Sequence, residues 1–161
     1  MFQITYTFFE IVGTIRFKRV RVHDERDNKQ GGAYMFDYTV KTDQSVEAVV
    51  EKLKATLKDE AFGVLWDFDL SDTLKEKGEA IDGDYRILEV CNPKEAKKVI
   101  TAHREGGYFL PCKLAVFTKD GATHVGMPKP TKLIELIEDE SLQSIALDVE
   151  TRLTRAIDNS I

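Results

Sequence analysis

Hydrophobic and polar positions along the chain change between two periods, and each change marks an expected element. Residues 35–40 suit a strand. The apolar positions over 46–57 then recur at the spacing of an amphipathic helix, which Asp43 or Ser45 can cap. Residues 62–70 alternate apolar and acidic side chains, which is the period of a strand.

The clearest helix start lies in the middle of the chain. Residues 85–91 are apolar on both faces, as a central strand is. Asn92 then suits the N-cap, Pro93 suits the first helical position, and Glu95 completes the pattern of a capping box. A strand followed directly by a helix is therefore expected here.

The last third of the chain predicts a hairpin and two helices. Gly106-Gly107 is expected to cap the preceding helix. Residues 112–119 and 122–127 are joined by an Asp-Gly turn that fixes the register of a hairpin. A short helix over 133–137 and a long one with an apolar stripe over 142–157 follow. This order indicates an α+β fold of two layers, with a mostly antiparallel sheet covered by helices on one face.

Length and composition support a single domain over residues 35–161. A chain of 161 residues with 42% hydrophobic residues can bury one good core. The net charge of -5 argues against nucleic acid as a partner, because such binders gather Lys and Arg on one face. No stretch suits a membrane segment, and two cysteines without a signal peptide favour free thiols and a cytoplasmic location.

Residues 1–34 differ from the rest of the chain. They are net positive, whereas the remainder is net negative. One interpretation is a genuine N-terminal extension that forms a hairpin or arm. The other is a start-site artefact, because the codons of Gln30 to Gly32 can contain a ribosome-binding sequence shortly before the codon of Met35.

Four short motifs after Met35 stand out: Gly63-Val64-Leu65, Cys91-Asn92-Pro93, Tyr108-Phe109-Leu110-Pro111-Cys112 and Gly126-Met127-Pro128-Lys129-Pro130. Together they resemble one known family, domain of unknown function 302 (DUF302), and the resemblance covers Met35 to about Asp158. It implies a small α+β domain similar to the TATA-binding-protein fold, often homodimeric, with no established activity, substrate or cofactor. Fold similarity to a DNA-binding protein is no evidence for DNA binding.

The two cysteines, each close to a proline, mark the candidate site. Cys91 lies one residue before a helix N-cap, where unpaired backbone amides favour a thiolate, so it is the candidate nucleophile with Cys112 as partner. Both cysteines also suit buried structural positions. Strand pairing can bring them to one level, but alternation directs the two thiols to opposite faces of the sheet. The expected ligand-binding residues are Cys91, Asn92, Pro111, Cys112, Met127 and Lys129.

Neither a metal site nor an acid-base pair has support from spacing. No metal and no cofactor are expected, because two cysteines and scattered histidines lack a zinc-binding pattern. The hairpin register places His124 opposite Phe117, too far from Cys112 for a catalytic dyad. Asp67 and Asp69 share a strand face and fit a solvated edge better than a catalytic pair.

The sheet carries more apolar groups than one helix-covered face requires. Part of the other sheet face is therefore expected to be covered, by a second subunit in an isologous dimer. The alternative is a small apolar ligand between the sheet and the helices. The main hypothesis is a cytoplasmic homodimer, without catalysis, that binds a small ligand or protein partner near the Cys-Pro loops. The alternatives are a thiol-dependent redox or soft-metal protein and a purely structural domain. The surplus groups are Trp66, Phe68, Tyr85, Ile87 and Phe117.

Overall fold

Five antiparallel strands form one sheet with the order β1-β5-β4-β3-β2. The computed structural model describes residues 36–137 and 139–161, so both interpretations of residues 1–34 lie outside the described part. The strands are β1 (Asp37–Thr42), β2 (Gly63–Asp69), β3 (Tyr85–Cys91), β4 (Cys112–Lys119) and β5 (Ala122–Pro128).

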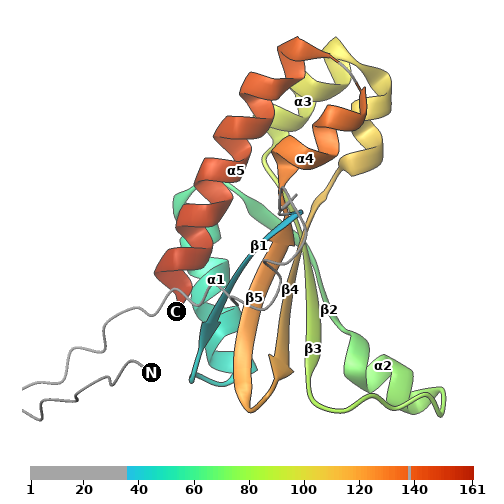
Figure 1. Cartoon of the computed structure of the whole chain (residues 1–161), viewed down its shortest axis with the longest axis vertical. Coiled ribbons are helices and arrows are strands. Elements are labelled where there is room, and N and C mark those ends of the chain that lie inside the picture. Colours follow the sequence, from blue (N-terminus) through green and yellow to red (C-terminus); the bar gives the residue numbers. More distant parts are fainter. Residues whose placement is uncertain (1–35, 138) are drawn as a thin grey trace, which may run out of the picture.

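Helices cover one face of this sheet and extend past one end of it (Figure 1). The first and last helices lie along the strands, α3 and α4 lie beyond one end of the sheet, and α2 lies at the other end. The predicted two-layer α+β arrangement is therefore confirmed. The helices are α1 (Val46–Asp59), α2 (Leu70–Glu76), α3 (Pro93–Ala102), α4 (Pro130–Ile134) and α5 (Glu140–Ser160), with short 3-10 turns η2 (Arg104–Phe109) and η3 (Glu135–Ile137).

Local signals set most of the helix boundaries. The hydroxyl of Ser45 caps α1 by accepting from the Ala48 amide at 3.3 Å. The α3 helix begins at Pro93 with Asn92 as its N-cap, as predicted. The α4 helix begins at Pro130 and not at residue 133, because proline fits the first helical position, where its missing N–H is not needed.

The β4–β5 hairpin has the predicted register. Lys119 pairs with Ala122, and Phe117 pairs with His124. Asp120 and Gly121 both have positive φ values, 52° and 75°, as a type I′ turn requires. The Asp-Gly pair therefore fixes which side chains of both strands face the helices.

The main core lies between α1, α5 and the inner face of the sheet. It combines the apolar stripe of each helix with alternate positions of the three central strands, such as Leu88 on β3 and Val116 on β4. Burial of one such side chain stabilises the fold by roughly 1.5–3 kcal/mol. A second, smaller cluster joins α3, α4 and α5 beyond the sheet, and its buried members are Val99, Ile134, Leu142 and Ala146.

Strand β2 departs from the alternation that its sequence predicts. The pattern places Val64 and Trp66 on one face, but the register shifts between them, so that Val64 pairs with Val90 and Trp66 with Glu89. A bulge of this kind adds one residue to a strand and turns the following side chains over. Val64 therefore packs on the core, whereas Trp66 is 60% exposed on the outer face. The expectation of a single face was wrong.

Candidate functional site

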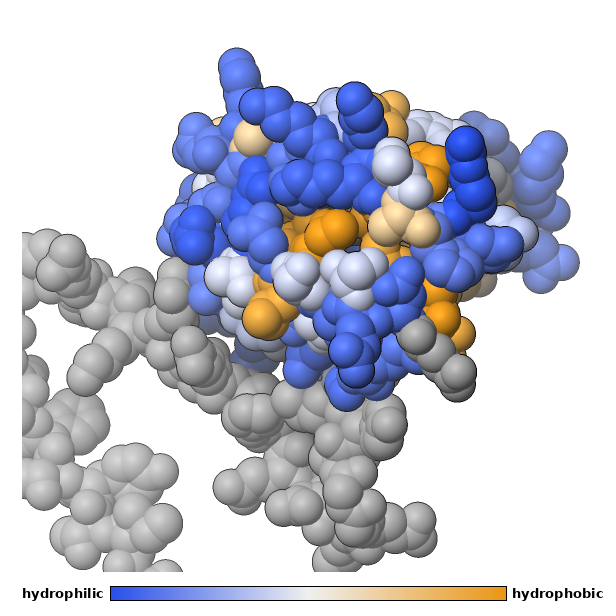
Figure 2. All heavy atoms as spheres, turned by 90° about the horizontal axis from the view of Figure 1, so that it is seen from above, coloured by the Kyte–Doolittle hydropathy of each residue, from blue (hydrophilic) through white to orange (hydrophobic). Residues whose placement is uncertain are grey.

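A cavity of about 360 Å³ lies where the sheet meets the helical end of the molecule. Its walls come from the ends of β3 and β4, from η2, and from α3, α4 and α5. Seen from that end, hydrophobic surface lies in a hollow ringed by hydrophilic residues (Figure 2). The volume is within the range of roughly 300–1,000 Å³ that is typical of small-molecule pockets.

Most of the cavity wall is apolar, and three wall positions carry very small residues. These are Ala96 on α3, Gly106 in η2 and Ala146 on α5. Packed interiors leave few voids larger than a water molecule, so the short side chains of Ala96 and Ala146, on two helices beside one space, account for the opening. The larger apolar residues of the wall include Phe62, Val99, Phe109, Leu110, Leu133, Ile134, Ile145 and Val149.

Gly106 lets η2 pack closely against α3. A Cβ atom added at Gly106 would lie 2.5 Å from Cγ1 of Val99, closer than real side chains approach. The expectation that Gly106-Gly107 caps α3 was wrong: α3 ends at Ala102, its C-cap is His103, and the two glycines belong to η2. Glycine is required here for close approach and not for a turn.

The structure brings together four of the six residues expected to bind a ligand. Met127 is buried in the main core, and Lys129 is the N-cap of α4. Neither lines the cavity, although the flanking Pro128 and Pro130 do. The four expected residues in the cavity wall are Cys91, Asn92, Pro111 and Cys112.

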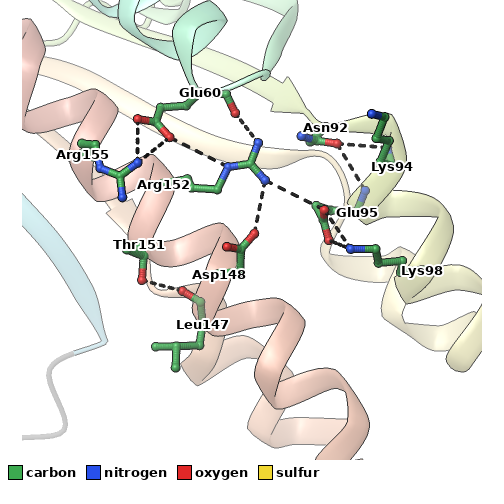
Figure 3. Close-up of polar contacts among 10 residues, drawn as sticks. All are labelled: Glu60, Asn92, Lys94, Glu95, Lys98, Leu147, Asp148, Thr151, Arg152 and Arg155. Atoms are coloured by element: carbon green, nitrogen blue, oxygen red, sulfur yellow. Dashed lines mark hydrogen bonds and ion pairs between the residues drawn. The ribbon is translucent and has the colours of Figure 1, made fainter.

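Asn92 connects the cavity to the start of α3. Its side-chain Oδ1 accepts hydrogen bonds from the Lys94 amide at 3.0 Å and the Glu95 amide at 3.3 Å. Figure 3 shows this oxygen directed at the helix and the amide nitrogen directed away from it. The Glu95 carboxylate accepts from Lys98 Nζ at 2.9 Å. Asn92 itself is only 6% exposed.

The two thiols lie on neighbouring strands but on different faces of the sheet. Cys112 pairs with Val90 and packs on the main core, whereas Cys91, one residue after Val90, points to the outer face. Burial raises the pKa of the Cys91 thiol. Burial and the neighbouring Cys91 raise the pKa of Cys112 to about 11. The thiolate expected at Cys91 is therefore disfavoured, since Asn92 already occupies the first amides of α3.

Arg152 on α5 makes polar contacts with residues of two other elements next to the site (Figure 3). Its guanidinium donates to the Glu60 carbonyl oxygen and lies 3.2 Å from Asp148 and 3.9 Å from Glu95. It also lies over the ring of Phe62, 5.2 Å from the centroid, and Phe62 lines the cavity. Arg152 therefore joins the end of α1, the start of α3 and the middle of α5 around one apolar wall.

The charged side chains in the cavity wall already have partners. Lys113 Nζ lies 3.5 Å from Glu89 across β3 and β4. Glu95 pairs with Lys98 and Arg152. Each carboxylate at the edge of this mainly apolar space is therefore neutralised by a nearby cation.

Asp67 takes part in an ion-pair cluster beside α1, away from the cavity. Its carboxylate lies 2.6 Å from Arg86 and 2.9 Å from Lys54. Burial alone would raise the pKa of Asp67, but the hydrogen bonds from Arg86 and Lys54 outweigh it and hold the pKa below its usual value. The predicted solvated edge is therefore a partly buried, paired carboxylate.

The histidines stand apart from the cysteines. His124 stacks on Phe117 with ring centroids 5.4 Å apart, on the face opposite Cys112. His103 Nδ1 pairs with Glu105 at 2.8 Å. Within residues 36–137 and 139–161, no group of three or more His, Cys, Asp or Glu side chains is arranged as metal ligands. The helices of that same part are all too short or too polar to cross a membrane.

Sequence reasoning missed the helical half of the cavity wall. Val99, Ile134 and Ala146 belong to apolar stripes that predict a core, and a stripe does not show which of its positions border a space. The signal that was missed is a small residue on each of two packed helices, Ala96 on α3 and Ala146 on α5. The sequence does not show that these helices pack together, because that contact is a property of the tertiary structure.

Comparisons with known proteins agree on one description. Residues 38–160 match the family described as "Domain of unknown function DUF302". A solved structure, "Crystal structure of uncharacterized conserved protein DUF302 from Bacillus stearothermophilus", is 45% identical in sequence with a TM-score of 0.77. The match covers 79% of this chain and 99% of that one. A search of the curated proteins found no match.

Proposed function

Since the chain belongs to the DUF302 family, which has no assigned activity, we propose from the geometry that it binds a small apolar molecule in the cavity beside the two Cys-Pro loops. The observation that supports this function is the cavity itself, which is about 360 Å³ in size and mainly apolar in lining. A few polar groups at its edge complete the pattern of a ligand pocket.

The cost of keeping the cavity open favours a binding role. An empty apolar cavity forfeits packing contacts and destabilises the fold. Elsewhere the chain packs closely, with Leu53, Leu114 and Leu153 fully buried. A ligand that occupies the cavity recovers the missing contacts and stabilises the folded state in proportion to its concentration.

The thiol-dependent alternative has less support. Catalytic thiols need a lowered pKa, whereas burial raises the pKa of both Cys91 and Cys112. Their side chains also lie on different faces of the sheet. We propose a location in the reducing cytoplasm, which fits the two free thiols.

A titration of the isotope-labelled protein with α-methylstyrene, followed by amide NMR shifts, tests the binding proposal. The amides of Val99, Gly106 and Ala146 are expected to shift together and reach saturation, because all three residues line the cavity. Amides of the distant turn at Asp120-Gly121 serve as the control and are expected to stay unchanged. Shifts confined to the outer sheet face, or none at all, would contradict the proposal.

We also propose that the chain forms a homodimer through the outer face of its sheet. This face carries Trp66 and the stacked pair of Tyr85 and Phe117, whose ring centroids are 5.2 Å apart. Glu89 and Lys113 lie on the same face, so the patch carries both charges beside its apolar surface. A patch with apolar surface and both charges can meet a second copy of itself across a two-fold axis, as an isologous dimer requires.

Sedimentation of the wild type and Trp66→Lys tests the dimer. The wild type is expected to sediment as a dimer at micromolar concentration and the variant as a monomer, because a buried unpaired lysine opposes association. Leu147→Lys, which changes an exposed residue of α5, is the matched control and is expected to remain dimeric. A monomeric wild type would rule the dimer out.

A further inference from the structure

We propose that the ligand is a small uncharged molecule with an apolar body and one hydrogen-bond-accepting oxygen, such as a ketone or aldehyde, and that Asn92 donates to this oxygen. The inference rests on the proposed binding function and adds the chemical class of the ligand. It starts from Asn92, the one amide side chain that the described residues place in the cavity wall.

The amide nitrogen of Asn92 has no hydrogen-bond acceptor in the described part of the chain. Its Oδ1 is committed to the amides of Lys94 and Glu95, which fixes the orientation of the planar amide group. The Nδ2 atom must then point away from α3, as Figure 3 shows. Asn92 lines the cavity, is 6% exposed, and its Nδ2 is not among the fully buried unpaired atoms, so we infer that the surface it keeps belongs to Nδ2 and faces the cavity.

A donor that faces a mainly apolar wall and has no protein acceptor can bind only water or a ligand there. Folded proteins usually pair such groups within the protein. Capping alone does not require the donor, since Ser or Asp caps a helix as well as Asn does and carries no amide donor. The position therefore holds one donor more than the fold needs, directed at the space where the ligand binds.

The charges around the cavity select against an ionised ligand. Two carboxylates, Glu89 and Glu95, line the wall with one ammonium group, Lys113. Glu95 follows Asn92 in the same helix start, so an anion that accepted from Nδ2 would approach a carboxylate. Both carboxylates are already paired, with Lys113 and with Lys98 and Arg152. A cation therefore finds no free countercharge, and burying an unpaired ion is expensive.

The rest of the wall sets the apolar part of the ligand. Beyond Asn92 the space is bounded by Val99, Ile134 and Ala146, which offer contact but no hydrogen bonds from their side chains. A ligand with an aromatic or branched apolar body would contact these side chains, and its carbonyl oxygen would accept the hydrogen bond from Asn92.

Two ligands of nearly the same shape test the hydrogen bond. Acetophenone carries a carbonyl oxygen where α-methylstyrene carries a methylene group, so only acetophenone can accept from Asn92. Dissociation constants for both are measured by NMR titration on the wild type and on Asn92→Asp. The variant keeps a capping oxygen and removes the donor. Asn92→Ser, which is uncharged and too short to reach the same point, is the second variant.

The quantity compared is the ratio of the two dissociation constants, α-methylstyrene over acetophenone, in the wild type and in each variant. The two ligands differ in hydration, but this difference is the same for every protein and cancels when the ratios are compared. Loss of a neutral hydrogen bond is expected to reduce this ratio about five-fold in both variants. Benzoate is expected to bind the wild type at least about ten-fold more weakly than acetophenone, because its carboxylate must be desolvated beside Glu95.

Each outcome identifies which proposal fails. An unchanged ratio in both variants, with both ligands still bound, overturns the role of Asn92 and leaves the binding function in place. Tighter binding of benzoate than of acetophenone overturns the uncharged class. If the wild type binds none of the three compounds, the binding function itself is overturned.

Discussion

Replacing Ala146 with leucine should stabilise the chain, although the position is almost fully buried. Ala146 lies on α5 in the wall of the cavity and packs in the smaller cluster with Val99 and Ile134. A leucine side chain adds three carbon atoms, and the cavity offers space for them without displacing neighbours. Enlarging a residue in a close-packed core usually has the opposite effect.

The size of the effect follows from the buried carbon atoms. Each buried methylene contributes about 0.8 kcal/mol, so three carbons contribute roughly 2.4 kcal/mol. Fixing the leucine rotamer costs about 0.5–1 kcal/mol. Ala146→Leu is therefore expected to raise the free energy of unfolding by about 1.5 kcal/mol and the Tm by about 4 °C.

Ala156→Leu on the same helix provides the matched control. Ala156 is fully buried in the main core, where its carbonyl oxygen accepts from Thr56 Oγ1 at 2.8 Å, and it does not line the cavity. Leucine there is expected to destabilise by about 1–3 kcal/mol. Calorimetry and urea denaturation measure both variants. If Ala146→Leu destabilises as much as Ala156→Leu, the reasoning about the cavity is refuted.

Three further changes test other parts of the structure. Gly106→Ala is expected to destabilise by about 1–3 kcal/mol in urea denaturation, because the new Cβ would lie 2.5 Å from Val99. Asp67→Asn is expected to cost about 1 kcal/mol at neutral pH and to flatten the acid loss of stability. The pKa of Asp67 is lowered by folding, so its contribution is present above about pH 4 and is lost as the pH falls through the folded value. In Cys91→Ser the effect of the neighbouring thiol is removed and burial alone raises the pKa of Cys112, so this thiol is expected to react with an aromatic disulfide reagent at pH 7 at least about ten-fold more slowly than a small thiol.

Each of these has an outcome that would contradict it. Gly107→Ala adds a Cβ that meets only Ile100, at 3.9 Å, so equal losses for both glycine changes would refute the close contact. Parallel curves of stability against pH for wild type and Asp67→Asn would show that Arg86 and Lys54 do not hold the carboxylate. A Cys112 rate like that of a small thiol would contradict its burial.

The fold could be predicted because its signals are local. The stripe of α1, the Asn92-Pro93 start of α3 and the Asp120-Gly121 turn each depend on neighbours in the sequence, and each lies where it was expected. The bulge in β2 could not be predicted in the same way. Gly63 lies just before it, but a glycine at the start of a strand does not show where the pairing of Trp66 with β3 shifts register.

The candidate site could be predicted only on its strand side. Cys91, Asn92 and Cys112 lie at strand ends beside prolines, and this local pattern marks loops that can carry a site. The cavity depends on small residues of separate helices meeting in space, which no single stretch of sequence shows. The pKa of Cys91 was misjudged for a related reason, since burial and the cap at Asn92 are properties of the folded chain.

Binding to the wild type and to Ala146→Leu tests the central claim most directly. Acetophenone titrated into both proteins is expected to saturate one site per chain in the wild type, with shifts at Val99 and Gly106. In the variant the affinity is expected to fall at least about ten-fold although the protein melts at a higher temperature, because leucine occupies the ligand space. Equal affinity for both proteins would contradict the claim that this cavity is the binding site.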